Sequence, residues 1–172
     1  MRNNFPVTDV EIELSDTETI VSTTDLQGNI TYANTYFIAI SGYTEDELIG
    51  APQNILRHPD MPVEAFADMW ATIRSGRSWT GMVKNRCKNG DAYWVMANAT
   101  PVMENGKAVG YMSVRTKPTR AQITAAAELY RNLKAGTAGN IRLQQGMVRA
   151  TGLRGWLAAA AHMTLRRRIA LN

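Results

Sequence analysis

Residues 79–116 read WTGMVKNRCKNGDAYWVMANATPVMENGKAVGYMSVRT, and this stretch carries the strongest fold signal in the chain. Apolar and polar side chains alternate in three runs: 79–88, 91–103 and 107–116. Alternation with a period of two is typical of β-strands. An Asn-Gly pair separates each run from the next, and Asn-Gly between strand patterns is the strongest short-range signal for a hairpin. The sequence therefore predicts a three-stranded antiparallel meander.

Two further strands are expected before the meander. Residues 20–24 are rich in β-branched side chains, which favour strands, and residues 30–32 follow after a Gln-Gly-Asn turn. Together with the meander, this pair gives an α+β domain built on a five-stranded antiparallel sheet with helices on one face.

Three helices are expected between the strand pair and the meander. Asn34 stands at a cap position before a short helix that Gly42 ends, and Thr44 to Glu47 fit a capping box. A longer helix over 62–75 carries four apolar residues at helical spacing: Phe66, Met69, Trp70 and Ile73.

Composition excludes several classes of protein. The chain has 172 residues, is 45% hydrophobic and 20% charged, and so can bury one sizeable core. Its single cysteine, Cys87, can form no internal disulfide and no zinc site alone. The start of the chain lacks the apolar core of a secretory signal, no apolar run is long enough for a membrane span, and no phosphate-loop, dinucleotide or hydrolase motif is present.

The charge is divided unequally along the chain. Residues 1–116 hold nine Lys and Arg against fourteen Asp and Glu, a net −5, whereas residues 117–172 hold ten against one, a net +9. We therefore divide the chain into an N-terminal cap segment (1–19), a sensor-like core (20–118) and a basic helical extension (119–172).

Alternation also sorts the meander's side chains by face. On the face that contains Trp79, the central residues are small: Gly81, Val83, Ala97, Ala99 and Ser113. Asn85 and Arg115 share this face, and an inward arginine is costly unless it has a partner. These residues indicate a site for a flat ligand between sheet and helices. They would also fit a helix packed closely on the sheet, with both polar groups bonded to protein. The opposite face reads as solvated, apart from an apolar patch of Trp94, Met96 and Met112 that suggests a docking surface for the N-terminal segment or a partner.

Five segments carry a family resemblance: STTDLQGNITYAN (22–34), SGYTEDELIG (41–50), RHPDMPVEAFADMW (57–70), the W-x-G-x-V-K-N-R-C-K-N-G-D-x-Y-W run (79–94) and GYMSVRTKPT (110–119). The chain resembles the flavin-binding branch of the PAS family, and within it the sensor domains of bacterial aerotaxis receptors. The resemblance covers roughly residues 19–155. It implies a PAS fold and a non-catalytic redox sensor that holds FAD without a covalent bond.

The resemblance also implies site residues. It points to Arg57, His58 and Asp60 in the flavin pocket and to Trp79 beside the ring system, with Asn34 as a further candidate. Without it, His58 to Asp60 would fit a plain turn before a helix, and Trp79 would fit the ordinary core.

Light-sensing members of the family have an asparagine and a glutamine on two strands, and these positions fall on Asn85 and Arg115. Their photoreactive cysteine falls on Gln53, so we expect no covalent photochemistry. Arg115 can only donate hydrogen bonds, whereas Asn85 can donate or accept. We therefore expect the oxidised and reduced states of a flavin to favour different partners.

The extension begins with a second capping box at Thr119 to Gln122. One apolar helical face follows and ends before Gly136, and we interpret this helix as an output helix rather than one packed on the core. The later arginines, at 142, 149, 154 and 166–168, and the apolar residues 156–161 indicate a segment beside an anionic membrane surface. Nucleic-acid binding is the competing interpretation of this charge, and no motif supports it.

The resemblance implies a longer, homodimeric receptor with membrane-anchor and HAMP-like signalling regions outside this sequence, its sensor on the cytoplasmic side of the inner membrane. Three alternatives remain: a haem-binding oxygen sensor that uses His58, a ligand-free dimerisation module, and a flavoenzyme, which ranks last because nothing in the sequence suggests a substrate channel or a catalytic base.

Overall fold

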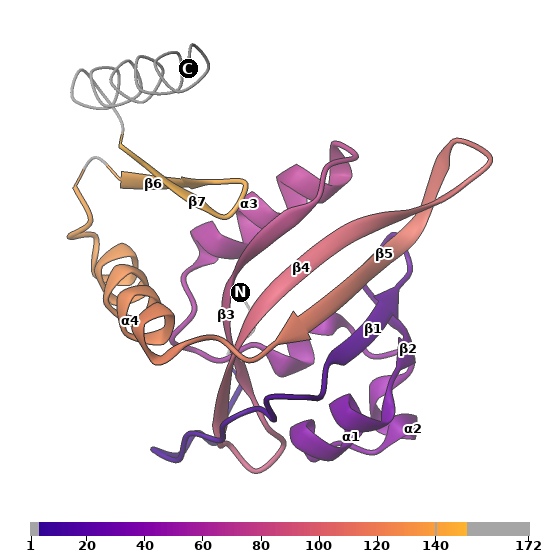
Figure 1. The fold of residues 1–172 in the computed structure, drawn as a ribbon, viewed down its shortest axis with the longest axis horizontal. Coiled ribbons are helices and arrows are strands. Elements are labelled where there is room, and N and C mark those ends of the chain that lie inside the picture. The colour runs from indigo at the N-terminus through magenta and orange to yellow at the C-terminus, as the bar shows by residue number, and fades with distance from the viewer. Residues whose placement is uncertain (1–3, 140, 151–172) are drawn as a thin grey trace, which may run out of the picture.

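A computed structural model describes residues 4–139 and 141–150 (Figure 1). Five strands form one antiparallel sheet in the order β2-β1-β5-β4-β3. Their bounds are β1 (Ile20–Thr24), β2 (Ile30–Ala33), β3 (Trp79–Arg86), β4 (Ala92–Glu104) and β5 (Lys107–Thr116). The predicted α+β class, the five-stranded sheet and the meander are confirmed.

The helices α1 (Thr35–Ser41), α2 (Glu45–Leu48) and α3 (Val63–Arg74) lie between β2 and β3, with a short 3₁₀ helix, η1 (Gln53–Leu56), before α3. Asn34 caps α1 through its side chain, and Thr44 and Glu47 form the predicted capping box of α2. Both caps supply partners for backbone N–H groups that have none within the helix. The Asn34 cap also fixes α1 beside β1, because the same Oδ1 accepts from the amide of Val21.

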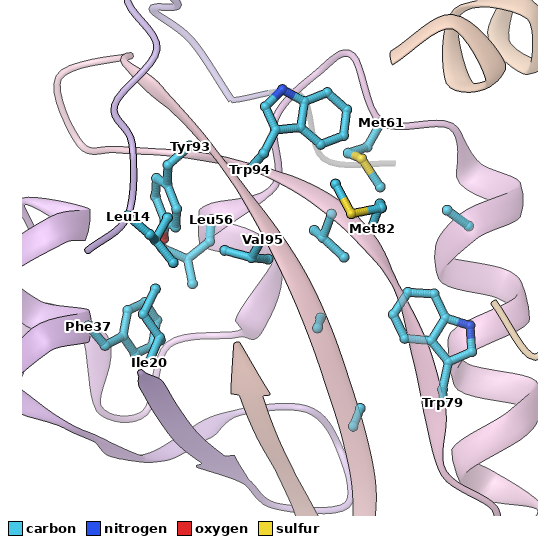
Figure 2. Close-up of a cluster of buried hydrophobic side chains, with 14 of the residues drawn as sticks. Leu14, Ile20, Phe37, Leu56, Met61, Trp79, Met82, Tyr93, Trp94 and Val95 are labelled. Atoms are coloured by element: carbon cyan, nitrogen blue, oxygen red, sulfur yellow. The ribbon is translucent and has the colours of Figure 1, made fainter. Parts of the chain in front are cut away.

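The core lies between the sheet and these helices. Figure 2 shows Ile20, Phe37, Leu56 and Tyr93 gathered in one cluster, and each is at most 1% exposed. One face of the sheet is therefore the inner face that the alternation predicted, with helices against it.

The opposite face of β3 and β4 is also covered, by helix α4 (Arg120–Ala135). The Tyr130 ring stacks on Trp94 with centroids 6.3 Å apart, and its hydroxyl donates to the Met82 carbonyl at 2.6 Å. This corrects two expectations. Trp94 in the apolar patch is covered by a helix of this chain, whereas Met112 stays 38% exposed, and the helix interpreted as an output helix packs on the core domain.

The N-terminal segment runs past the turn between β3 and β4 and beside the start of β4. The amide of Ile12 donates to the Ala92 carbonyl at 2.7 Å, and the Pro6 carbonyl accepts from Arg86 Nε at 2.7 Å. Arg86, assigned to the solvated face from alternation, is only 5% exposed because this segment covers it. The segment also reaches α4, since Arg120 forms ion pairs with Glu11 and Glu13.

After α4 the chain forms a two-stranded hairpin, β6 (Ile141–Gln144) and β7 (Met147–Ala150), that the sequence analysis did not predict. Its turn lies against α3, as Figure 1 shows. Arg154, Arg166–Arg168 and the apolar residues 156–161 lie outside the described residues. No helix in the part of the chain that the structure describes combines the length and hydrophobicity of a membrane span.

Candidate functional site

A cavity of about 270 Å³ lies between the inner face of the sheet and α3. Its sheet side consists mainly of small or short side chains from the three meander strands, Val83, Asn85, Ala97, Ala99 and Ser113, together with the long side chain of Arg115. Its helix side comes from α3: Phe66, Met69, Trp70, Ile73 and Arg74. A cavity therefore lies between sheet and helices, where a ligand site was expected.

Trp70 and Tyr111 bring helix and sheet together at this cavity. Their rings meet edge to face with centroids 5.6 Å apart. At Gly28, which has a positive φ of 87°, a Cβ would lie 3.0 Å from the Trp70 ring. The cavity is thus bounded by aromatic rings that could pack on a flat ligand.

Arg115 lies at the deep end of the cavity and is 3% exposed. One of its terminal nitrogens donates to the Ser22 hydroxyl, and its guanidinium carbon lies 4.5 Å from the centre of the Phe37 ring. Its Nε has no hydrogen-bond partner among the described residues. Burial lowers the pKa of Arg115 to about 10, so the group remains a cation at neutral pH.

Arg57 approaches the cavity from the other side, just after η1. Its guanidinium carbon lies 3.9 Å from the centre of the Phe66 ring. Its buried Nε also lacks a partner within the described chain, and burial lowers its pKa. The backbone of Arg57 forms an isolated antiparallel bridge with Asn85, so two cavity-lining residues are fixed side by side.

The cavity therefore brings together three of the seven predicted site residues: Arg57, Asn85 and Arg115. A buried polar group without a partner costs free energy, because the hydrogen bonds it makes to water are not replaced. Two partnerless arginine nitrogens and the partnerless Gln53 Oε1 all belong to residues that line this one space. Such a space is suited to a ligand that carries both acceptors and donors.

Trp79 does not line the cavity, although it lies on the inner face of β3. Its ring folds across Gly81, where a Cβ would overlap it. Its Nε1 donates to Asp68 Oδ2 of α3 at 2.8 Å. In Figure 2, Trp79 lies further along the strand, away from Phe37 and Tyr93. Trp79 thus connects β3 to the helix that forms the cavity wall.

His58 and Asp60 also lie outside the cavity lining. The buried Nδ1 of His58 accepts the backbone N–H of Asp60 at 3.0 Å, which closes the turn before α3. Burial lowers the pKa of His58 to about 4. The exposed Asp60 carboxylate pairs with Lys84 at 2.8 Å on the opposite face of the sheet. Both residues hold the loop that carries Arg57.

Asn34 ties three segments together. Its Oδ1 accepts from the amides of Val21 and Phe37 at 3.1 Å each, and its Nδ2 donates to the Thr19 carbonyl at 2.8 Å. It therefore fixes β1 against α1 and lies outside the cavity lining.

Sequence reasoning missed several cavity residues: Gln53, Phe66, Trp70 and Tyr111. Phe66 and Trp70 were assigned to an apolar helix face, and their aromatic character opposite a strip of small strand residues was the available signal. Among the described residues, no cluster of three or more His, Cys, Asp or Glu side chains could hold a metal ion.

The chain is similar to known proteins in sequence and in fold. The chain is 50% identical over 160 residues to the aerotaxis receptor of Escherichia coli strain K12. The aligned stretch covers 93% of this chain and 31% of the receptor. It is 31% identical over 96 residues to a nitrogen fixation regulatory protein of Klebsiella pneumoniae, over 55% of this chain and 19% of that protein. The chain thus spans less than a third of these relatives.

The dark structure of the blue-light photoreceptor Aureochrome1 LOV superposes with a TM-score of 0.56 and 22% identity, covering 67% of this chain and 84% of that one. At that identity the likeness concerns the fold. The sequence profile of the PAS fold matches residues 30–115, which hold all of the sheet except β1 and the end of β5. The resemblance inferred from the sequence motifs is confirmed: the chain belongs to the PAS fold family.

Proposed function

We propose that the chain is a non-catalytic redox sensor that holds FAD in the cavity beneath the sheet and serves aerotaxis signalling. One observation carries the proposal above the others. Arg115, which is buried, and Arg57, which is half-buried, each have a buried, partnerless Nε in a cavity whose sheet floor is lined mainly by small side chains and whose opposite wall holds aromatic rings. A flavin would satisfy them, because its flat ring system has an apolar body and a polar edge of oxygen and nitrogen atoms.

The shape of the cavity supports the same ligand. Ala97, Ala99 and Ser113 leave a shallow floor on the sheet, while Phe66 and Trp70 form the opposite wall. The volume of about 270 Å³ is close to the lower end of the range of about 300–1,000 Å³ typical of small-molecule sites. This fits a bound ring system with the remainder of the cofactor reaching towards the opening.

When bound, a flavin supplies a redox centre whose charge and hydrogen-bonding capacity change on reduction. Arg115 can only donate, so it favours the state with more negative charge near the sheet. Asn85 can turn its amide to donate or accept, so it can serve either state. Because Arg115 lies at the end of β5, and Lys117 to Thr119 connect β5 to α4, a change in its bonding would act on the start of α4.

Haem binding through His58 is less favoured. His58 does not line the cavity, and its Nδ1 is occupied by the backbone of Asp60. A ligand-free dimerisation module is also less favoured, because it leaves the buried arginine nitrogens without partners.

Cofactor analysis of the purified protein tests the proposal. We expect a flavin absorption spectrum that bleaches reversibly with a reductant, and release of FAD on acid denaturation, identified by chromatography. A haem band would instead support the oxygen-sensor alternative, and a folded protein that neither contains nor takes up a chromophore would contradict the proposal.

A cavity-filling substitution gives a sharper test. Ala99→Phe places a ring on the cavity floor and should abolish flavin binding, whereas Ala71→Phe on the exposed side of α3 should not. Equal flavin content in the two variants would show that the flavin binds elsewhere.

The aerotaxis role rests on the 50% identity to the aerotaxis receptor. Introduced into the full-length receptor, Ala99→Phe should abolish migration in an oxygen gradient and leave chemotaxis to amino acids intact. Normal migration in oxygen would contradict this role.

A further inference from the structure

The turn of the β6–β7 hairpin docks on one carboxylate of α3. The backbone N–H of Gln145 donates to Asp68 Oδ1 at 2.6 Å, and that of Gly146 donates to Asp68 Oδ2 at 2.6 Å. Both turn residues have positive φ, 54° and 77°, which directs two successive N–H groups to the same side. Such a pair of amides is a small anion-binding concavity, and Asp68 fills it.

Asp68 is also fixed from the sheet. The same Oδ2 that binds Gly146 accepts Trp79 Nε1 at 2.8 Å, and Trp79 is 1% exposed. Charge-assisted bonds of this kind are about twice as strong as neutral ones. The carboxylate therefore joins β3, α3 and the hairpin turn at one point.

The docked turn fits closely against β3. A Cβ at Gly146 would overlap the Thr80 carbonyl oxygen, so only glycine allows this approach. Leu143 of β6 packs against the core cluster from the same hairpin. The two amide bonds are thus accompanied by tight backbone contact.

Helix α3 contributes residues both to the cavity and to the contact with the hairpin turn. Five of its residues, Phe66, Met69, Trp70, Ile73 and Arg74, line the cavity, and Asp68 lies among them in sequence on a face that the hairpin contacts. A helix of twelve residues moves largely as one body, because its own hydrogen bonds hold it together. Any ligand in the cavity that shifts α3 must therefore also shift Asp68.

We propose that the Gln145-Gly146 turn is a latch whose docking on Asp68 is coupled to the occupancy of the cavity, so that the hairpin after α4 reports what the cavity holds. The coupling rests on the proposed function, since it requires a flavin in the cavity. A bound ring between Phe66 and the sheet holds α3 in the position that the latch requires. By thermodynamic reciprocity, the latched turn in turn favours the ligand-bound cavity.

Hydrogen exchange of the Gln145 and Gly146 amides, resolved by NMR, tests the latch in the flavin-loaded protein and after the flavin is removed. We expect slow exchange in the loaded protein, with acceleration on the order of tenfold or more in Asp68→Asn and after flavin removal. Gly146→Ala should accelerate the exchange of Gln145 in the same way.

Gly106→Ala is the matched control for Gly146→Ala. Gly106 has the same φ of 77°, but a Cβ there would meet no atom within 4 Å. The Gly106→Ala substitution therefore imposes similar backbone strain without disturbing the latch, and the amide of Gln145 should exchange as fast as in the wild type.

Other outcomes separate the two proposals. Equal exchange in wild type and Asp68→Asn would overturn the docking. Exchange that responds to Asp68→Asn but not to flavin removal would overturn the coupling and leave the proposed function intact. A folded protein that takes up no flavin would overturn both the proposed function and the coupling.

Discussion

The guanidinium of Arg115 lies 4.5 Å from the centre of the Phe37 ring, and among the described residues no carboxylate forms an ion pair with it. A ring face attracts a cation but does not neutralise it. Burial already lowers the pKa of Arg115 to about 10, which reflects the cost of holding this charge away from water. The arrangement is therefore suited to an electron-rich ligand that supplies the missing negative charge.

Arg115→Gln should weaken flavin binding by about 10- to 100-fold, because a hydrogen bond to a charged group contributes about 1.5–3 kcal/mol. The flavin that remains should be harder to reduce, since the added negative charge loses its cation. Flavin titration and a reductive titration measure the two effects. Arg131→Gln, on an exposed position of α4, is the control and should change neither. A variant with unchanged affinity and potential would exclude Arg115 from the site.

The features predicted correctly from the sequence depend on local interactions. The capping boxes at Thr44 and Thr119 each join residues three positions apart, and Asn-Gly turns fix their hairpins within four residues. Asn85 and Arg115 line one cavity because β-strand alternation alone determines which side chains share a face, whereas Arg57, which lies on no strand, was expected there only from the family resemblance.

The features that were missed depend on distant partners. Arg86 is buried because Pro6, 80 positions away, accepts its hydrogen bond, and alternation says nothing about what covers a face. The turn of the β6–β7 hairpin is Gln145-Gly146, which is a weaker turn signal than Asn-Gly. Asp68, to which this turn binds, is 77 positions from Gln145 in the sequence. Neither contact could be inferred from the residues around it.

Trp79→Phe should destabilise the fold without removing the flavin. The substitution keeps a ring across Gly81 but removes the bond to Asp68, which we expect to cost about 1–3 kcal/mol in the free energy of unfolding. Urea denaturation measures this loss. Trp94→Phe, on the opposite face, is a control for ring size. A marked change in the flavin spectrum of Trp79→Phe would instead place Trp79 beside the ring system.

Asn34→Ala should be more destabilising than the loss of an ordinary cap. It removes the cap of α1 and two further bonds to β1 and to Thr19, for a total of about 2–4 kcal/mol. Thr44→Ala removes only the bonds of the Thr44 hydroxyl to the Glu47 amide and carboxylate, leaves the bond from the Thr44 backbone N–H to Glu47, and should cost about 0.5–2 kcal/mol. Urea denaturation compares them. Equal losses would mean that the bonds from Asn34 to β1 contribute nothing.

The stability of the protein should fall between pH 6.5 and pH 4 because of His58. Its pKa is lowered from 6.5 to about 4 in the folded state, first by burial and then by the charge of Lys84. The unfolded chain therefore binds a proton in this range that the folded chain does not, so the contribution is complete above pH 6.5 and decreases as the pH falls. The expected loss is about 2–3 kcal/mol.

His58→Asn separates this effect from the titration of carboxyl groups. Asparagine offers an acceptor to the Asp60 amide in place of Nδ1, but it does not titrate. The free energy of unfolding of the variant, measured by urea denaturation at several pH values, should be nearly constant from pH 6.5 to pH 4.5, where the wild type declines. Parallel declines in the two proteins would show that other groups cause the pH dependence.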